Sequence, residues 1–205
     1  MVDNSGSIQP GLIQIQQAIR SLNDKRKPGD QLGLVLFAEA DRVKTMQTPA
    51  PRPLESTVVT GEGDYTALWD GVLEGLSQAK SCTVAGRYLI VLTDGSDNQS
   101  RQLTGDNLER ARIVAWLAEG QNVGVCTVGV KSKDLEEEPL KLAAHGCGYY
   151  NAASFDEVAS LFQRIFGFVR DFYRIQLSSD GLIGGQQVIK LRVLDTTEVS
   201  VDFGK

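Results

Sequence analysis

Oxygen-bearing side chains are concentrated near the start of the chain. The run Asp3-Asn4-Ser5-Gly6-Ser7 has the form Asp-x-Ser-x-Ser, so one carboxylate and two hydroxyls occupy alternate positions of a short loop. Side chains spaced in this way can converge on one point. Hard oxygen ligands suit Mg²⁺, Mn²⁺ or Ca²⁺, and the loop has no soft ligand for zinc or copper. The alternative is a plain turn, in which Ser5 or Ser7 caps the following helix and Asp3 fixes the loop.

Apolar patterning places this loop between a strand and a helix. Apolar residues recur at three- and four-residue spacing over 12–22, which is typical of a helix with one buried face. Only Met1 and Val2 precede Asp3, whereas a buried strand usually has about five or six residues. We therefore expect most of the first strand to lie outside this sequence. In a parallel sheet, the loop would lie at the carboxyl edge, where ligands bind.

A second oxygen-rich loop follows residues 87–93 (RYLIVLT), a near-continuous apolar run typical of a strand buried on both faces. The run leads directly into Asp94. If the strands follow the order 3-2-1-4-5, this strand lies beside the first one, and right-handed crossovers send their helices to opposite faces. A crevice then opens between the two loops. The sequence therefore predicts that Asp3 and Asp94 meet at one edge of the sheet.

A third loop, residues 61–66, is glycine-rich and acidic and ends at Thr66. It precedes a helix that we expect over about 67–80. The threonine adds a hydroxyl to the oxygen set. Two nearby carboxylates, Asp64 and Asp97, are candidates for groups that do not bind the metal themselves but contact the residues that do. For Asp97, an equally good interpretation is that its carboxylate only keeps its own loop in contact with water.

Strand and helix patterns alternate through most of the chain. Besides the run at 87–93, strands are expected at 32–38, 123–130, 149–152 and, with a polar sequence typical of a position at or near a sheet edge, 41–48. Further helices are expected at 105–119, 155–172 and, interrupted by Pro139, within 134–144. This alternation predicts an α/β fold with a doubly wound, mainly parallel sheet flanked by helices. Trp69 and Trp116 are expected to pack helices against that sheet.

The pattern changes after Tyr173. Strands are expected to follow one another without intervening helices, at 173–178, 187–194 and 199–203. We therefore predict two parts. Residues 1–172 form the α/β domain, and residues 173–205 form a short β-rich appendage or the start of a second β domain.

The composition of the 205 residues is that of a globular protein, since 41% are hydrophobic and the formal net charge is −5. The acidic balance, without basic runs, argues against a nucleic-acid partner. No apolar run is long enough for a transmembrane segment, and no signal peptide is visible.

The cysteines Cys82, Cys126 and Cys147 are odd in number and lack the spacing of a metal site. A bridge between Cys126 and Cys147 is one interpretation, because both residues could lie on neighbouring strands. Buried free thiols are the favoured interpretation.

The three loops together resemble those of the von Willebrand factor type A domain, also called the integrin I-like domain. Asp3-x-Ser5-x-Ser7, Thr66 within GDYTALWD and Asp94 within TDG match, in order, the three parts of that family's metal-ion-dependent adhesion site. The resemblance covers about residues 1–172. It implies that Ser5 and Ser7 bind a metal directly, Thr66 directly or through water, and Asp3 and Asp94 mostly through water.

The threonine loop departs from the family's pattern at one point. Asp64 and Tyr65 stand where the family usually has two glycines. This change would stiffen the loop or add a negative charge near the metal.

The function that the resemblance implies is a non-enzymatic, Mg²⁺-dependent module for protein binding or adhesion, with Mn²⁺ or Ca²⁺ as alternative metals. Three neutral hydroxyls and two carboxylates leave a divalent ion short of negative charge compared with a carboxylate-rich calcium loop. A protein or glycan partner that presents a carboxylate would therefore complete the coordination.

Two other functions remain open. One is a regulatory or scaffold subunit of an intracellular AAA+-type machine. The other is a metal-dependent hydrolase, which is disfavoured because the only histidine, His145, is remote in sequence from the loops. We assign no catalytic residue. The β-rich tail resembles strands that follow such domains in bacterial secreted or envelope-anchored proteins, which favours an extracellular, periplasmic or cell-surface location.

Overall fold

The computed structural model describes residues 1–84, 86–170, 188–193 and 197–202. The chain divides into two compact units, Met1–Phe172 and Tyr173–Lys205, and each is described by itself.

A six-stranded sheet forms the centre of the first unit, in the order β3-β2-β1-β4-β5-β6. All neighbouring strands are parallel except β2 and β3. The strands are β1 (Val2–Asp3), β2 (Leu32–Phe37), β3 (Lys44–Ala50), β4 (Tyr88–Thr93), β5 (Gly124–Val130) and β6 (Gly146–Ala152). The predicted α/β fold and strand order are confirmed, and the polar strand β3 does lie at an edge.

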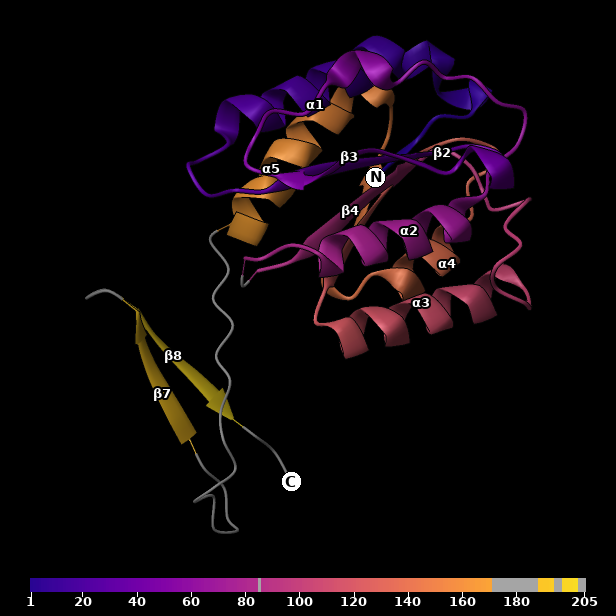
Figure 1. Ribbon diagram of the computed structural model, residues 1–205. Helices are drawn as coiled ribbons and strands as arrows, with labels where there is room; N and C mark the ends of the chain where they lie inside the picture. The colour runs from indigo at the N-terminus through magenta and orange to yellow at the C-terminus, as the bar shows by residue number, and fades with distance from the viewer. Residues whose placement is uncertain (85, 171–187, 194–196, 203–205) are drawn as a thin grey trace. The chain divides into compact units, whose positions relative to one another are not determined.

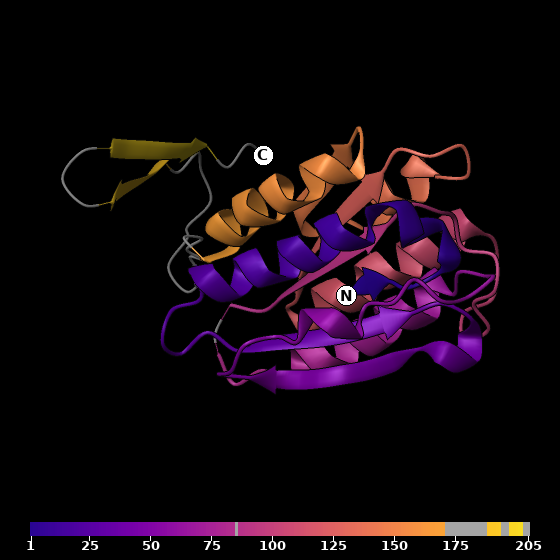
Figure 2. The same cartoon turned by 90° about the horizontal axis from the view of Figure 1, so that it is seen from above.

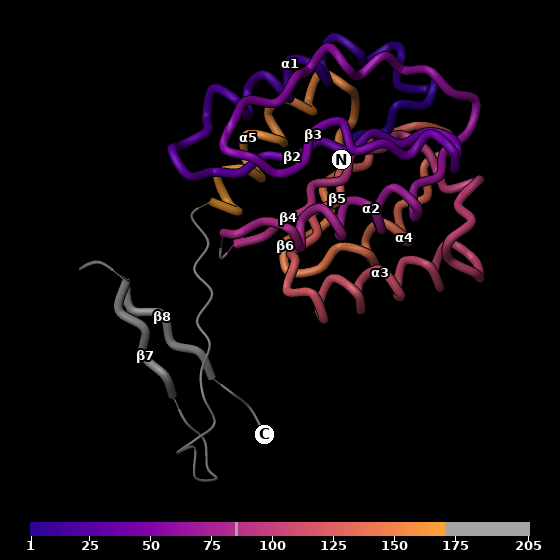
Figure 3. Tube along the Cα trace, in the orientation of Figure 1, coloured from indigo at the N-terminus to yellow at the C-terminus, as the bar shows by residue number. Residues whose placement is uncertain are grey.

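Helices cover both faces of this sheet. They are α1 (Leu12–Lys25), α2 (Leu68–Lys80), α3 (Asn107–Gln121), α4 (Glu137–Ala143) and α5 (Val158–Arg170). Helices α1 and α5 lie on one face and α2, α3 and α4 on the other (Figure 1). Figure 2 shows α1, in indigo, and α5, in orange, side by side, and Figure 3 follows the chain through the three layers.

The sheet has an apolar core on each face, because its inner strands alternate apolar residues between two helical layers. Leu34 and Leu36 pack towards α1 and α5, whereas Val35 and Phe37 pack towards α2. This arrangement accounts for the near-continuous apolar runs, which are typical of strands buried on both faces.

The two tryptophans differ in their positions. Trp69 is 1% exposed and packs in the core, as predicted, but the prediction for Trp116 is wrong, since it is 70% exposed on α3. The buried positions of α3 are held instead by Ala111, Val114 and Ala118, whose small side chains let the helix lie close to the sheet.

Two local predictions are also corrected. Pro139 does not interrupt a helix but lies in the first turn of α4, where a missing N–H costs no hydrogen bond. Strand β6 begins at Gly146, whose φ of 65° favours glycine, rather than at Tyr149. Val125 lies opposite Gly146 and Cys126 opposite Gly148, so Cys147 is the extra residue of an irregularity in the β5–β6 ladder, beside Cys126.

Cys126 and Cys147 form a disulfide that links β5 to β6. The favoured interpretation of free thiols is thus wrong for this pair, and Cys82 is the free cysteine. The pairing follows from the early start of β6, because that strand carries Cys147 to within 5.0 Å of Cys126, measured between Cα atoms.

In the second unit, β7 (Val188–Val193) and β8 (Thr197–Asp202) form an antiparallel pair in which Val193 lies opposite Thr197. The strand expected at 173–178 lies outside the described residues. Among the helices that the structure describes, none combines the length and apolarity needed to span a bilayer.

Candidate functional site

The first and second oxygen-rich loops lie side by side at the carboxyl edge of the sheet. Strand β1 ends at Asp3 and strand β4 ends at Thr93, and the two strands are parallel neighbours, with Val2 opposite Leu92. Because parallel neighbours end at the same edge, the residues that follow them meet there.

A continuous set of hydrogen bonds joins four of the predicted site residues. The Ser5 N–H donates to Asp3 Oδ1 at 2.9 Å, the hydroxyl oxygens of Ser5 and Ser7 are 3.0 Å apart, and Ser7 Oγ donates to Asp94 Oδ1 at 2.7 Å. We call Asp3, Ser5, Ser7 and Asp94 the oxygen cluster. Its oxygens come from both loops, and these hydrogen bonds join each residue of the cluster to the next.

Thr93 also belongs to this site, although the sequence reasoning assigned it no role. Its hydroxyl is fully buried and donates to Asp3 Oδ2 at 2.6 Å. The same oxygen accepts the Gly95 N–H at 3.2 Å. Thr93 therefore fixes the second oxygen of Asp3 and the start of the Asp94 loop. The signal was its place directly before Asp94 in the TDG run.

The third loop joins the other two through its backbone. The Gly63 carbonyl accepts the Gly6 N–H at 2.7 Å, and a Cβ on Gly6 would lie only 3.1 Å from that oxygen, so glycine permits the approach. Thr66 and Asn98 are joined twice, because Asn98 Oδ1 accepts the Thr66 N–H at 2.8 Å and the Thr66 carbonyl accepts the Asn98 N–H at 3.0 Å.

Thr66 faces the Asp94 loop. Thr66 is 6% exposed. If Gly95 carried a Cβ, that atom would lie 3.8 Å from the hydroxyl oxygen of Thr66. The structure therefore places the threonine hydroxyl beside the Asp94 loop, at Gly95. Asn98, which holds the threonine loop in this place, is a further residue that the sequence reasoning did not single out.

The two carboxylates expected to support the site differ in role. Asp97 is buried, pairs with Arg110 at 2.6 Å and accepts the Trp69 N–H at 3.4 Å, so it holds the start of α2 behind Thr66. Asp64 is exposed, and its backbone N–H donates to Glu39 Oε1 at 2.9 Å. Asp97 therefore positions the threonine loop, whereas the Asp64 side chain is turned to solvent.

Burial makes both carboxylates of the oxygen cluster unusual acids. Loss of solvent raises the pKa of Asp3 to about 6, against the lowering effect of its hydrogen bonds with Thr93 and Ser5. Burial likewise raises the pKa of Asp94, which Ser7 partly opposes by its hydrogen bond. Two negative charges brought together out of water favour a cation between them.

The donor set fits a hard divalent cation. Every side-chain ligand on offer is an oxygen, as Mg²⁺, Mn²⁺ and Ca²⁺ prefer. Within the described residues, no three His, Cys, Asp or Glu side chains gather as a metal site. A cation at this edge would therefore need the hydroxyls of Ser5, Ser7 and Thr66 beside the two carboxylates.

Comparison with known proteins identifies the family. Residues 1–164 match the model of the von Willebrand factor type A domain, and the chain belongs to this family. A curated relative, an uncharacterised protein of Borreliella burgdorferi, is 29% identical over 147 residues. This match covers 70% of the chain but only 40% of the relative, so the chain spans less than half of that protein's length.

Solved structures share the fold at low sequence identity. Proximal thread matrix protein 1 from the mussel byssus, solved with a zinc-occupied MIDAS motif, has a TM-score of 0.62 at 18% identity over 80% of this chain and 46% of that one. The von Willebrand factor domain of the type V pili tip protein Mfa5 from Porphyromonas gingivalis has a TM-score of 0.65 at 12% identity, over 87% of this chain and 96% of that one.

Proposed function

We propose that this domain binds a protein partner through a divalent metal ion held at the oxygen cluster. Ser5, Ser7 and Thr66 would be the metal ligands, with Asp3 and Asp94 holding the surrounding water and offsetting the charge. The observation that carries the proposal is the hydrogen-bonded set running from Asp3 to Asp94 across two strand ends. Membership of a family known for metal-dependent adhesion supports it, as does the zinc-occupied motif of the mussel protein.

The proposed metal is Mg²⁺, with Mn²⁺ or Ca²⁺ as alternatives. Hydroxyl-rich sites with few carboxylates suit a small ion that keeps several waters, as Mg²⁺ does. One of those waters is the position that a partner would take. Because the site supplies only two carboxylates, a third carboxylate from a protein or glycan partner would improve the charge balance.

The surface around the cluster is suited to contact with a partner. Ser7 is exposed, and Tyr65, beside Thr66, is 50% exposed. Exposed tyrosines are enriched in protein interfaces because they bury a large area while losing little side-chain freedom. A partner seated on the metal would therefore cover Tyr65 as well.

Calorimetric titration with Mg²⁺, Mn²⁺ and Ca²⁺ tests the metal site. One ion is expected to bind the parent chain, and Ser5→Ala and Asp94→Ala are expected to lose this binding while remaining folded. Ser160→Ala and Asp156→Ala are matched controls, because both residues are exposed and lie on or beside α5. A folded parent that binds none of the three ions, or variants that bind as the parent does, would refute the site.

Dependence on the partner's carboxylate is tested once a partner has been captured in Mg²⁺ and released by EDTA. Replacing its contacting Asp or Glu by the amide is expected to weaken metal-dependent binding at least about tenfold, which corresponds to 1.4 kcal/mol. Unchanged affinity after each acidic residue of the contact surface has been replaced would exclude the carboxylate mechanism.

We also propose that the domain is not an enzyme. His145, the only histidine, directly precedes β6. Its backbone N–H donates to the Val125 carbonyl at the amino end of β5, so the residue lies at the opposite end of the strands from the oxygen cluster. A general base beside the metal would have to be a carboxylate that the cation already engages. A phosphatase and esterase screen with Mg²⁺ tests this, and activity that disappears in Asp3→Ala would overturn the proposal.

An extracellular, periplasmic or cell-surface location completes the proposal. The Cys126–Cys147 disulfide supports it, since such bridges persist in oxidising compartments and are rare in the cytosol. Thiol labelling of protein taken directly from its source cells provides the test. A single reactive thiol, Cys82, is expected after denaturation, whereas three would argue for a reducing compartment.

A further inference from the structure

The first loop has two sides. Three of its residues belong to the oxygen cluster, and the two that alternate with them, Asn4 and Gly6, face the third loop instead. The Gly6 N–H donates to the Gly63 carbonyl at 2.7 Å, and the Asn4 side chain binds the backbone of Thr60 and Gly61. One side of the loop therefore offers oxygens to a cation, while the other binds the neighbouring loop.

Two amide side chains bind all four backbone polar groups of Thr60 and Gly61, where the third loop begins. Asn4 Oδ1 accepts the Thr60 N–H at 2.8 Å and the Gly61 N–H at 2.9 Å. Gln9 Nε2 donates to the Thr60 carbonyl at 2.7 Å and to the Gly61 carbonyl at 2.9 Å. We call Asn4 and Gln9 the amide clamp. On this backbone, one of the two side chains uses only its oxygen and the other only its nitrogen.

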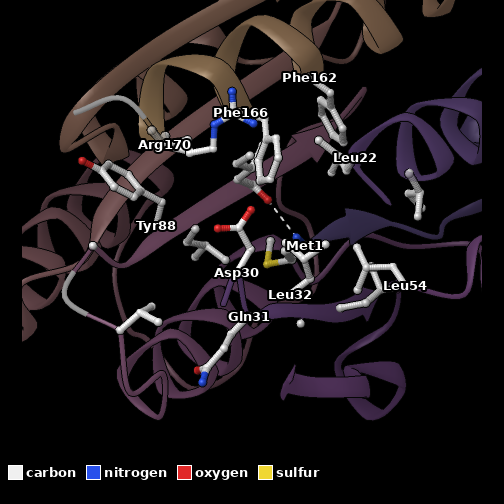
Figure 4. Close-up of a pocket in the computed structure, with 18 of the residues that line it drawn as sticks. Met1, Leu22, Asp30, Gln31, Leu32, Leu54, Tyr88, Phe162, Phe166 and Arg170 are labelled. Carbon is white, nitrogen blue, oxygen red and sulfur yellow. Dashed lines mark hydrogen bonds between the residues drawn. The ribbon is translucent and has the colours of Figure 1, made fainter. Parts of the chain in front are cut away.

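The clamp is anchored to the sheet. Asn4 directly follows β1, and its backbone N–H donates to the Phe37 carbonyl of β2 at 2.7 Å. On the β4 side, the Met1 amine donates to the Ile90 carbonyl at 2.8 Å, as Figure 4 shows, and the Met1 carbonyl accepts the Leu92 N–H at 3.2 Å. Both neighbouring strands therefore hold the first loop before it reaches the third.

The third loop takes its shape from contacts with other segments. Residues 59–67 form no helix or strand. Gly61 and Gly63 have φ angles of 67° and 144°, which favour glycine and leave this stretch of backbone conformationally permissive. Further along the loop, Asn98 Oδ1 accepts the Thr66 N–H at 2.8 Å. The amide clamp fixes the start of the loop, as Asn98 fixes its end.

We propose that Asn4 and Gln9 are positioning residues that hold the third loop in place, so that the Thr66 hydroxyl already lies beside the Asp94 loop when a metal arrives. This inference rests on the proposed function, because it concerns the affinity of the same metal site. The apparent dissociation constant is the intrinsic one divided by the fraction of molecules whose loop is already in place. Breaking the clamp lowers this fraction, and the metal affinity falls in proportion.

The clamp lies at the surface, with Thr60 and Gln9 exposed. Water can replace a hydrogen bond that is lost there, so breaking the clamp is expected to loosen the loop without unfolding the domain. A merely structural role would instead lower the stability of the whole domain and leave the order of this loop unchanged.

Exchanging each amide of the clamp for a carboxylate of the same shape gives a test with opposite outcomes. Asn4→Asp keeps the oxygen that accepts both N–H groups, and the Thr60 hydroxyl, now 3.3 Å from Asn4 Nδ2, can donate to its second oxygen. Gln9→Glu loses the donor and turns a negative charge towards two carbonyls. An effect of added charge alone would be alike in the two variants. Gln17→Glu, exposed on α1, is the matched control.

The first readout needs no metal. Amide hydrogen exchange is followed by NMR on the full 205-residue chain in EDTA. Gln9→Glu and Asn4→Ala are expected to speed exchange of the Thr66 amide at least about tenfold while the amides of β5 stay unchanged, whereas Asn4→Asp and Gln17→Glu stay within about twofold of the parent. Asn98, not the clamp, accepts the Thr66 N–H, so faster exchange there reports a loosened loop. Unchanged exchange in Gln9→Glu and Asn4→Ala, or fast exchange in Asn4→Asp, would overturn the proposal.

The second readout is the affinity for Mg²⁺ in calorimetry. Gln9→Glu and Asn4→Ala are expected to weaken binding at least about tenfold, although the first of them adds a negative charge. In a Thr66→Ala background, Asn4→Ala is expected to weaken binding by less than about twofold, because the hydroxyl that the clamp positions is gone. A tenfold loss that persists in that background would overturn the proposal. A parent chain that binds no divalent ion would refute the proposed function instead, and the exchange measurement would still decide whether the clamp orders the third loop.

Discussion

Replacing Asp3 with asparagine is expected to stabilise the metal-free domain and abolish its response to metal. Asp3 is 0% exposed, and burial raises its pKa from 3.8 to about 6. A carboxyl group with a raised folded-state pKa is favoured in its protonated form, so its ionisation destabilises the fold. This cost appears as the pH rises from about 4 to 6 and is complete above pH 6. At 1.36 kcal/mol per pKa unit, it amounts to about 3 kcal/mol.

The asparagine can keep the hydrogen bonds of the carboxylate. Its Oδ1 accepts the Ser5 N–H as Asp3 Oδ1 does. Its Nδ2 donates to the Thr93 hydroxyl, which turns its own hydrogen to the Gly95 carbonyl, 3.1 Å away. The expected gain at pH 7.5 is thus about 2–3 kcal/mol, or roughly 4–12 °C in the unfolding midpoint for a domain of this size.

Urea unfolding in EDTA at pH 7.5 and at pH 4 measures the effect. The gain is expected at pH 7.5 and to shrink towards zero at pH 4, where Asp3 is protonated in the folded chain. Mg²⁺ at 100 times its Kd is expected to stabilise the parent by about 2.7 kcal/mol and the variant not at all. Asp156→Asn, an exposed control, should stay within about 0.5 kcal/mol of the parent. An Asp3→Asn variant less stable than the parent at pH 7.5, or a gain equal at both pH values, would refute the reasoning.

Three further outcomes are expected. Ser7→Ala should weaken Mg²⁺ binding about tenfold or more in calorimetry and should cost about 1–3 kcal/mol of stability in EDTA, because it removes the hydrogen bond that Ser7 donates to the buried Asp94 carboxylate. Arg110→Ala should cost about 3 kcal/mol in urea unfolding, because it leaves the buried Asp97 carboxylate without its charge partner. Exchanging Cys126 and Cys147 for serine should cost about 2–4 kcal/mol, and dithiothreitol should lower the melting midpoint of the parent but not of this variant.

The fold was predictable because its signals are local. Residues 32–38 and 87–93 are apolar on both faces, which only a strand covered on both sides can satisfy. The order of the strands was taken as a condition, that of a doubly wound sheet, and the meeting of the Asp3 and Asp94 loops followed from it, because periodicity carries no long-range information.

The candidate site was predictable only for side chains that offer ligands directly. Asp3, Ser5, Ser7 and Asp94 do come together, and the Thr66 hydroxyl lies beside the Asp94 loop, at Gly95. Thr93 and Asn98 were missed because they are not ligands and instead fix neighbouring loops by hydrogen bonds to Asp3 and Thr66. Such hydrogen-bond partners depend on which loops lie next to each other in the folded chain, and residue spacing in the sequence does not predict this.

The disulfide and Trp116 show where sequence patterns give too little information. The sequence predicts a strand only from Tyr149 and leaves the bridge as the less favoured interpretation, whereas in the structure the strand begins at Gly146, with Gly146 and Gly148 both at positive φ. Trp116 was assigned to the core from its residue type alone. Its helix buries alanines and a valine instead, and the apolar residues of α3 are spread around its axis.

The paired bonds between Thr66 and Asn98, with the Gly6–Gly63 bond, have a consequence for protein engineering. Each of the three loops holds another in position, so no single loop carries its own shape. A designer who transplanted the Asp-x-Ser-x-Ser segment alone onto another α/β scaffold would move the ligands without their supports. The smallest transferable unit is the set of three loops together with the two parallel strands whose ends set their separation.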